Sequence, residues 1–181
     1  MRPLLRLAML TVPLLAASAR AGAQDTTLAR NSTGEKRSGW LTGASIGVPA
    51  YEGDALTEML TIGVHWTQLR PGRLGADFSL GTMPRTVAEG VAVVGARGGV
   101  ALPLALSSGV LVLPSAGVSF LGGVGAGGGG VTTGLNAGIA AVIFGASSVG
   151  LRTGVTWHRF GDAESAVALW EIGLVRVPRP R

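Results

Sequence analysis

The sequence predicts an all-β fold, an eight-stranded antiparallel up-and-down barrel whose strands cross a membrane. In the segment 165–177 the even-numbered positions from 166 to 174 are apolar: Ala166, Ala168, Trp170, Ile172 and Leu174. The segment 148–160 repeats the alternation, and its other face carries Arg152, Gly154, Thr156 and His158. Composition is the third observation, with 30 glycines, no cysteine and 14% charged residues. A period of two is typical of strands, and a barrel in lipid turns its apolar face outward.

The first 23 residues have the pattern of a secretory signal peptide. Arg2 and Arg6 supply a positive start, residues 7–17 form a short apolar core, and Ala21-Gly22-Ala23 suits a signal peptidase. An apolar core of this length is too short to anchor the chain across a bilayer. We therefore divide the chain into a cleaved signal 1–23, a flexible periplasmic lead-in 24–38, the barrel 39–177 and a periplasmic tail 178–181.

The exported chain is almost neutral. Its formal charge of +5 includes Arg2, Arg6 and Arg20. These leave with the signal, so 12 of the 15 basic residues remain against 10 acidic ones, about +2. The remaining charges form no cluster, so we expect no nucleic-acid partner. With no cysteine, disulfides do not hold the exported domain.

Eight strands account for the region 39–177. The third has the cleanest alternation, with Leu74, Ala76, Phe78 and Leu80 on one face. Pro114 falls inside the fifth, and because proline cannot donate to a ladder we expect a bulge or a shorter strand there. Gly122–Gly130 reads as a glycine loop. The expected strands are 39–48, 58–67, 73–82, 90–102, 109–121, 131–144, 148–160 and 165–177.

The register of the last hairpin follows from matching faces. A reversal centred on Gly161-Asp162 pairs residues whose numbers sum to 323. Outward Thr153 then faces outward Trp170, and inward Arg152 faces inward Glu171. A slip of one residue would move Glu171 into lipid, so the faces constrain the register.

The connections sort by length into two groups. With a periplasmic N-terminus, the connections 69–73, 103–108 and 145–147 are periplasmic and short. The connections 49–57, 83–89, 122–130 and 159–164 are extracellular and mostly longer, as is usual in outer-membrane barrels. Aromatic residues at the two membrane interfaces are expected to form a girdle. They are Trp40, Trp66 and Phe144 at the periplasmic rim and Phe120, Trp157 and Phe160 at the outer rim.

With its signal, its strand alternation and its final strand Trp170-Glu171-Ile172-Gly173-Leu174, the region 39–177 resembles small eight-stranded outer-membrane barrels of the OmpA/OmpX type. The resemblance implies an outer-membrane location, outer-membrane lipid and the assembly machinery as partners, and a monomer. Such barrels usually end in an aromatic residue that the assembly machinery reads. This chain ends Val177-Pro178-Arg179-Pro180-Arg181, so its assembly needs an internal signal or a variant rule.

Inward-facing polar residues predict a network inside the barrel. An eight-stranded barrel has a lumen just wide enough for side chains to fill. Two acids and two bases there can neutralise one another, which makes buried charge tolerable. We favour a structural plug over a gate or a narrow ion path. The predicted lumen network comprises Asp77, Arg97, Asn136, Arg152 and Glu171.

The histidines and the glycine run do not predict an enzyme or a cofactor. His65 and His158 are too few and too far apart to hold a metal. Lipid A deacylases of the PagL type have a catalytic histidine near the outer rim followed by a serine two residues later. Here Phe160 stands at that position, leaving Asp162 and Glu164 as partners for His158. Gly125–Gly130 matches G-x-G-x-x-G, but a strand follows where a dinucleotide site needs a helix.

Two other architectures fit the sequence less well. An inner-membrane helix over 98–121 would contain Pro103 and Pro114, which break helices. A soluble lipocalin-like ligand-binding barrel would need large apolar side chains inside, and the predicted inward faces are mostly Gly, Ser, Thr and charge. We predict an outer-membrane protein with a structural or surface-interaction role and a plugged lumen. A small-solute channel, a lipid A-modifying enzyme that uses His158 and a soluble ligand-binding barrel are the alternatives, in that order.

Overall fold

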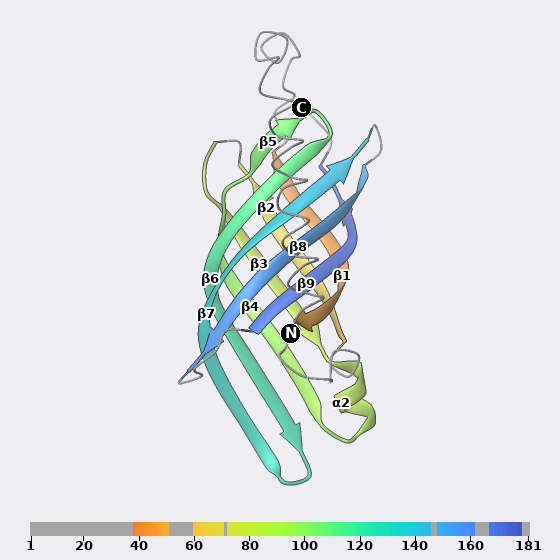
Figure 1. The fold of residues 1–181 in the computed structure, drawn as a ribbon, viewed down its shortest axis with the longest axis vertical. Helices are drawn as coiled ribbons and strands as arrows, with labels where there is room; N and C mark the ends of the chain where they lie inside the picture. Colours follow the sequence, from red (N-terminus) through yellow and green to blue (C-terminus); the bar gives the residue numbers. More distant parts are fainter. Residues whose placement is uncertain (1–37, 51–59, 71, 146–147, 162–166, 179–181) are drawn as a thin grey trace, which may run out of the picture.

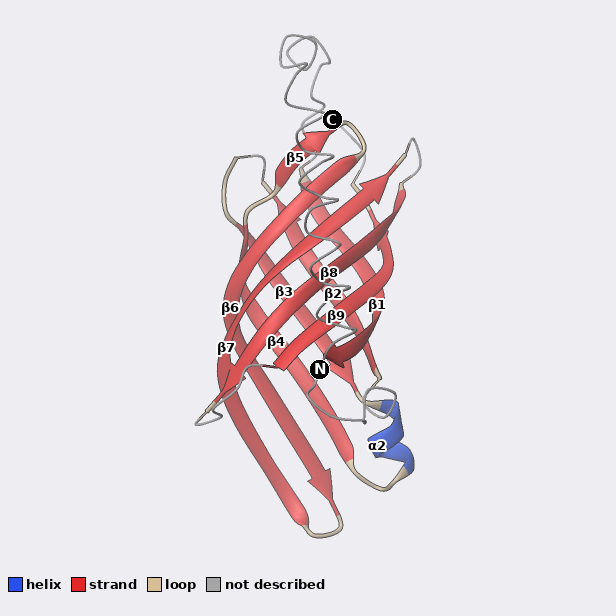
Figure 2. Cartoon of the chain, viewed as in Figure 1, coloured by secondary structure: helices blue, strands red, loops and turns tan. Residues whose placement is uncertain are grey.

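The computed structural model describes residues 38–50, 60–70, 72–145, 148–161 and 167–178. Most of them are in strands (Figures 1 and 2). The signal peptide and most of the lead-in lie outside the described residues, as does much of the predicted connections 49–57 and 159–164. In chain order the elements are β1 (Gly39–Ala50), β2 (Thr61–Leu69), β3 (Gly75–Thr82), α2 (Pro84–Ala88), β4 (Ala92–Ala101), β5 (Leu104–Ser107), β6 (Val110–Gly125), β7 (Gly128–Phe144), β8 (Val149–Phe160) and β9 (Val167–Arg176).

Eight of these strands close into an antiparallel barrel. Strands that follow one another in the sequence pair with each other, except β4 and β5. In addition, β1 pairs with β9 and β4 pairs with β6. The short β5 adds to β6 where β4 has ended. The predicted fold class, an eight-stranded up-and-down β-barrel, is therefore confirmed.

The barrel has two distinct ends. The end near α2, called the α2 end below, also carries the turn between β6 and β7, and this hairpin reaches beyond the other strands (Figure 1). The opposite end, called the β5 end, holds β5 and the last residues of β9. The projection follows from strand length, since β6 and β7 have 16 and 17 residues and β8 ends at Phe160 opposite Gly134.

The period of two in the sequence corresponds to the two faces of the wall. In β9, Trp170, Ile172 and Leu174 are exposed on the outside, whereas Glu171 and Val175, at odd-numbered positions on the other face, are buried. The other barrel strands repeat this division over most of their length, whereas β5 is exposed at all four of its residues. A chain that exposes this many large apolar side chains on its outer wall presents a surface suited to hydrocarbon rather than water. Among the described residues, no helix has the length and apolar character needed to cross a membrane.

The predicted register of the last hairpin is wrong by two residues. Thr153 faces Ile172 and Gly154 faces Glu171, so paired residue numbers sum to 325 instead of 323. The shift leaves every face unchanged because side chains alternate with a period of two. Trp170 still contacts Thr153, now diagonally, through an indole N–H that donates to Thr153 Oγ1 at 3.2 Å.

The glycine loop predicted over Gly122–Gly130 is also wrong. β6 continues to Gly125, β7 begins at Gly128, and only Ala126 and Gly127 form the turn. Gly128 adopts a positive φ of 119°, a conformation that glycine tolerates best. Glycines leave no side-chain alternation to read, so the sequence pattern could not reveal these strand ends.

Pro114 lies inside β6, and the irregularity is on the neighbouring strand. β4 ends at Ala101 and β5 begins at Leu104, so the ladder is interrupted beside the proline. Leu102 N–H donates to the Pro114 carbonyl at 2.9 Å, so the proline carbonyl is satisfied although the proline has no N–H to donate. The predicted connection 103–108 thus contains β5, and the connection 83–89 contains the short helix α2.

Candidate functional site

Four charged side chains form a layer across the lumen, called the polar layer below. Asp77 comes from β3, Arg97 from β4, Arg152 from β8 and Glu171 from β9, and all four are buried. A Glu171 carboxylate oxygen lies 3.5 Å from Arg97 Nη1 and 3.4 Å from Arg152 Nη1. Arg97 Nε lies 3.9 Å from Asp77. Two positive and two negative groups therefore balance inside the barrel, the arrangement that makes buried charge tolerable.

Neutral hydroxyl groups complete the polar layer. Thr67 donates to Asp77 at 2.6 Å and Ser45 donates to Glu171 at 3.3 Å. Arg97 Nη1 donates to Thr156 Oγ1 at 2.6 Å. These three hydroxyls were not predicted as members of the network, although Ser45 and Thr156 stand on the faces assigned inward. Their inward position was the feature of the sequence that could have predicted them. Inward hydroxyls near inward charges supply the hydrogen bonds that buried ions need.

The fifth predicted member, Asn136, belongs to a separate chain of hydrogen bonds. Its side-chain nitrogen donates to Ser119 Oγ at 2.9 Å, and Ser119 Oγ lies 2.8 Å from His158 Nδ1. Ser119 therefore receives one bond from Asn136 and can donate its own proton to the histidine. His158 also stacks on Phe160, with ring centroids 5.8 Å apart.

Several donors in and near the polar layer have no hydrogen-bond partner among the described residues. They include Arg97 Nη2, Arg152 Nε, His158 Nε2 and both ring nitrogens of His65. His65 is nearly inaccessible, with 1% of its surface exposed. Within the described part of the chain, no three His, Cys, Asp or Glu side chains gather to hold a metal ion.

Toward the β5 end, buried apolar side chains inside the barrel form a cluster, called the apolar layer below. They pack in one buried cluster contributed by the strand ends on that side of the barrel. Leu41 and Val142 are fully inaccessible. The cluster comprises Leu41, Leu69, Leu111, Leu113, Ala140, Val142, Phe144, Val175 and Val177.

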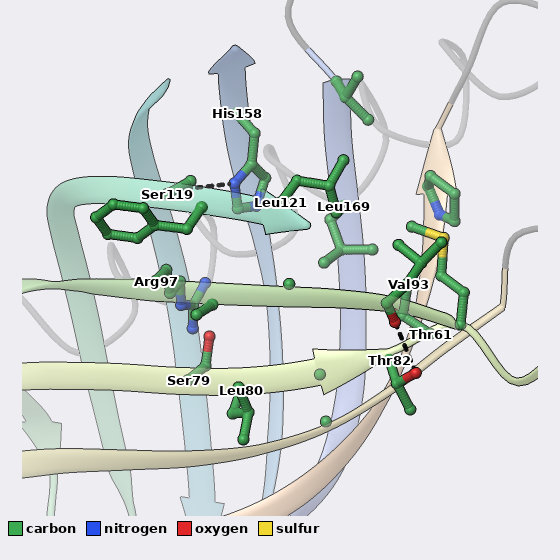
Figure 3. Close-up of a pocket in the computed structure, with 18 of the residues that line it drawn as sticks. Thr61, Ser79, Leu80, Thr82, Val93, Arg97, Ser119, Leu121, His158 and Leu169 are labelled. Carbon is green, nitrogen blue, oxygen red and sulfur yellow. Dashed lines mark hydrogen bonds between the residues drawn. The ribbon is translucent and has the colours of Figure 1, made fainter. Parts of the chain in front are cut away.

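Toward the α2 end, the lumen contains a pocket of about 220 Å³ (Figure 3), called the lumen pocket below. Arg97, Ser119 and His158 of the polar residues line it, and Figure 3 shows the contact between Ser119 and His158. Its remaining lining is mainly apolar and includes Leu121 and Leu169. Inward glycines leave the space open, since Gly63, Gly81 and Gly95 line the same pocket without side chains.

The predicted aromatic girdle needs two corrections. Trp40, Trp66, Phe120 and Trp157 lie exposed on the outside of the barrel. Phe144 is instead buried in the apolar layer, and Phe160 lines the lumen pocket beside His158. Both residues stand at inward positions of their strands, so the alternation of faces excludes them from the lipid side.

The sequence matches no protein-family model, and none of the curated protein sequences matches it significantly. Solved structures do match. Ail, the attachment invasion locus protein of Yersinia pestis, aligns with a TM-score of 0.54 and 11% identity over 78% of this chain and 97% of Ail. The N-terminal β-barrel domain of Pseudomonas aeruginosa OprF aligns with a TM-score of 0.55 and 11% identity, covering 75% and 96% of the two chains. The chain has the fold of the small outer-membrane β-barrels.

Neisserial surface protein A, another small outer-membrane β-barrel, also aligns, with a TM-score of 0.50, 13% identity and coverage of 77% of this chain and 96% of its own. At such identities the likeness concerns the fold, and function has to come from the residues of the site.

The contact between Ser119 and His158 bears on the alternative of a lipid-modifying enzyme. A serine does lie beside His158, although it comes from β6 and not from two residues downstream. A catalytic serine needs a base that a third group orients. Among the described residues no carboxylate bonds to His158, and its Nε2 is unpartnered. Asp162 and Glu164, the carboxylates that the sequence offered as partners of His158, lie outside the described residues. The described pair of Ser119 and His158 shows no third group, so it does not by itself favour hydrolysis.

Proposed function

We propose that this protein is an outer-membrane β-barrel with a structural or surface-interaction role, and that side chains plug its lumen. The observation that carries the proposal is Glu171, which joins Arg97 and Arg152 across the inside of the barrel. Ionic side chains that are paired in this way occupy the space through which a solute would have to pass.

The apolar outside of the barrel supports a position in the outer membrane. Exposed Leu, Ile, Val, Phe and Trp side chains cover the wall, and they would be costly in water. Closed barrels leave no strand edge unpaired in lipid, which is why such structures can span a membrane. In this proposal the α2 end faces outward, because it carries the projecting β6–β7 hairpin, and the β5 end faces the periplasm.

The two layers in the lumen support a plug over a channel. A solute entering from the α2 end meets the polar layer and then the apolar layer, whose side chains pack together with little exposed surface. An eight-stranded barrel has a lumen that side chains can fill. The small-solute channel is therefore the weaker alternative.

A surface-interaction role is supported by the projecting hairpin. Ail, which shares the fold, is named as an attachment and invasion protein and was also solved with the heparin analogue sucrose octasulfate. In this chain no charged residue occurs between Arg97 and Arg152, so the β6–β7 hairpin lacks the basic groups that a polyanion requires. We propose an uncharged partner surface for this hairpin and not a heparin-like one.

The proposal is tested by measuring the conductance of the protein in a planar bilayer and the membrane exposure of labelled residues. The refolded protein, added to a planar bilayer, should give no stepwise currents, and regular single-channel steps would establish the channel instead. In nanodiscs, a spin label at Ile172 should be accessible to lipid-soluble oxygen and one at Glu171 should not. Partition of the folded protein into the aqueous phase of a detergent separation would establish the soluble barrel.

A further inference from the structure

We propose that the lumen pocket binds the end of an amphiphile, with a carboxylate or ester carbonyl against Arg97 and His158 and an alkyl chain along the apolar wall. The fold by itself assigns no ligand to this space. The polar layer, which forms part of the proposed plug, lies on the side of the pocket toward the β5 end. The pocket has about 220 Å³, roughly the liquid volume of seven water molecules. That volume suits one short or medium alkyl chain and excludes a whole phospholipid.

The base of the pocket presents donors that lack acceptors. Arg97 has a side chain that is only 5% exposed, and its Nη2 has no hydrogen-bond partner among the described residues. His158 Nδ1 accepts the Ser119 proton if Asn136 donates to Ser119 as observed. The second ring nitrogen, Nε2, then carries the hydrogen, and it is also unpartnered. Two N–H groups in one pocket that have no acceptor among the described residues favour a ligand that brings one, because buried donors are almost always satisfied.

The side chains on the walls of the pocket indicate the chemical character of the ligand beyond its head group. Leu121 of β6, Leu169 of β9 and Val93 of β4 line it (Figure 3). Apart from the groups at the base, the lining offers little to a polar molecule, so the part of the ligand beyond its head must be apolar. Glu171 also lines the pocket, and its negative charge disfavours a dianion such as a phosphate monoester.

The ion pairs and the free donors at the base of the site disfavour a cationic head. Arg97 and Arg152 already balance Asp77 and Glu171 through the ion pairs of the polar layer. The free hydrogen-bonding capacity at the base is that of donors, which an ammonium group cannot satisfy. An acceptor head, from a free fatty acid or from the ester of a membrane lipid, is the chemistry that fits.

The test follows the methyl groups of Leu121 and Leu169 by NMR on the complete exported chain in nanodiscs. Decanoate should shift these methyls along a saturating curve, whereas lipid-facing Leu174 should change only linearly, through partition into the bilayer. Decyltrimethylammonium, with the same tail, should give a shift at least tenfold weaker at equal concentration. Equal saturation by both probes would overturn the assignment of the head group, and no saturation by decanoate would overturn the site.

Two glycine substitutions on β4 provide a matched pair. Gly95→Leu adds a side chain inside the pocket, and its Cβ would meet Leu121 at an ordinary 3.8 Å. Gly98→Leu adds the same side chain on the outside, where its Cβ would lie 3.5 Å from Phe78. Decanoate saturation should be lost in the first variant and retained in the second. If Gly95→Leu fails to give a strand spectrum, Leu121→Phe fills the same space from β6, and retained saturation in a folded filling variant would refute the site.

The same spectra distinguish the two sources of the ligand. If lipid esters occupy the pocket, Leu121 methyls should show cross-peaks to lipid acyl protons before any probe is added, and decanoate should compete with them. If free carboxylates are the ligands, these cross-peaks should be missing and decanoate should bind without competition.

Discussion

The two halves of the lumen differ in how completely side chains fill them. At the β5 end, inward positions carry Leu, Val and Phe, which pack into the apolar layer. At the α2 end, inward positions of β2, β3 and β4 carry Gly63, Gly81 and Gly95, and a pocket remains. The polar layer separates the two. Large inward residues accompany the buried cluster and inward glycines accompany the pocket, so the size of the inward residues differs between the two levels.

The largest effect is expected at the boundary between the halves. Glu171→Ala removes the carboxylate that Arg97 and Arg152 share and leaves two buried cations with one acid. The free energy of unfolding should fall by about 3–5 kcal/mol, the usual cost of breaking a buried ion pair from one side. Urea unfolding in lipid vesicles measures it. Arg159→Ala, at an exposed position of β8, is the control, and equal losses in both variants would contradict the network.

The next prediction compares the two halves directly. Leu41→Ala in the packed apolar layer should lower the free energy of unfolding by about 2–5 kcal/mol, because it opens a cavity among side chains that cannot collapse. Leu121→Ala borders a pocket that already exists, so its loss should be less than half as large. The same urea titration measures both variants. Equal losses would mean that the α2 end is packed as tightly as the β5 end.

A smaller effect concerns the close approach of β4 and β6. Gly117 faces Gly99 across this pair, and a Cβ on Gly117 would collide with the backbone of Gly98 and Gly99. Gly117→Ala should therefore destabilise the barrel by about 1–3 kcal/mol through overpacking. Gly130→Ala in the projecting hairpin meets no atom within 4 Å and serves as the matched control in the same thermal or urea titration. A Gly117→Ala variant as stable as wild type would show that these strands are free to separate.

The smallest effect is expected at Ser119. Ser119→Ala removes the hydroxyl that links Asn136 to His158. Because Asn136 and His158 are direct neighbours across β7 and β8, they can bond to each other, and the loss should stay near 1 kcal/mol. The His158 ring resonances should shift in the NMR spectrum. Unchanged resonances would mean that the serine does not contact the ring.

The alternation of faces was the reliable part of the sequence prediction. Trp170 and Glu171 lie on the faces assigned to them although the hairpin register is shifted by two residues. Period-two patterns fix the face of a residue but leave even shifts undetermined. The same alternation also excluded Phe144 and Phe160 from the girdle, where a general preference of aromatic residues for the interface had placed them.

Contacts across several strands were beyond the sequence. The Ser119–His158 contact depends on the registers of β6 with β7 and of β7 with β8 together, and no local pattern specifies either. The pocket was missed for a related reason. Inward glycines were visible in the sequence, but only the closed ring shows that Gly63, Gly81 and Gly95 lie at one level.

The pairing of β1 with β9 has a consequence for the order in which the barrel forms. Residues of β6 and β7 pair across a two-residue turn, so this hairpin can assemble from neighbouring parts of the chain. Ser45 and Glu171, which meet at the β1–β9 seam, are 126 positions apart. Contacts between distant positions carry the larger entropic cost of loop closure and form late. The barrel should therefore close last, at the β1–β9 seam. Closure there also positions Glu171, the carboxylate that pairs with Arg97 and Arg152.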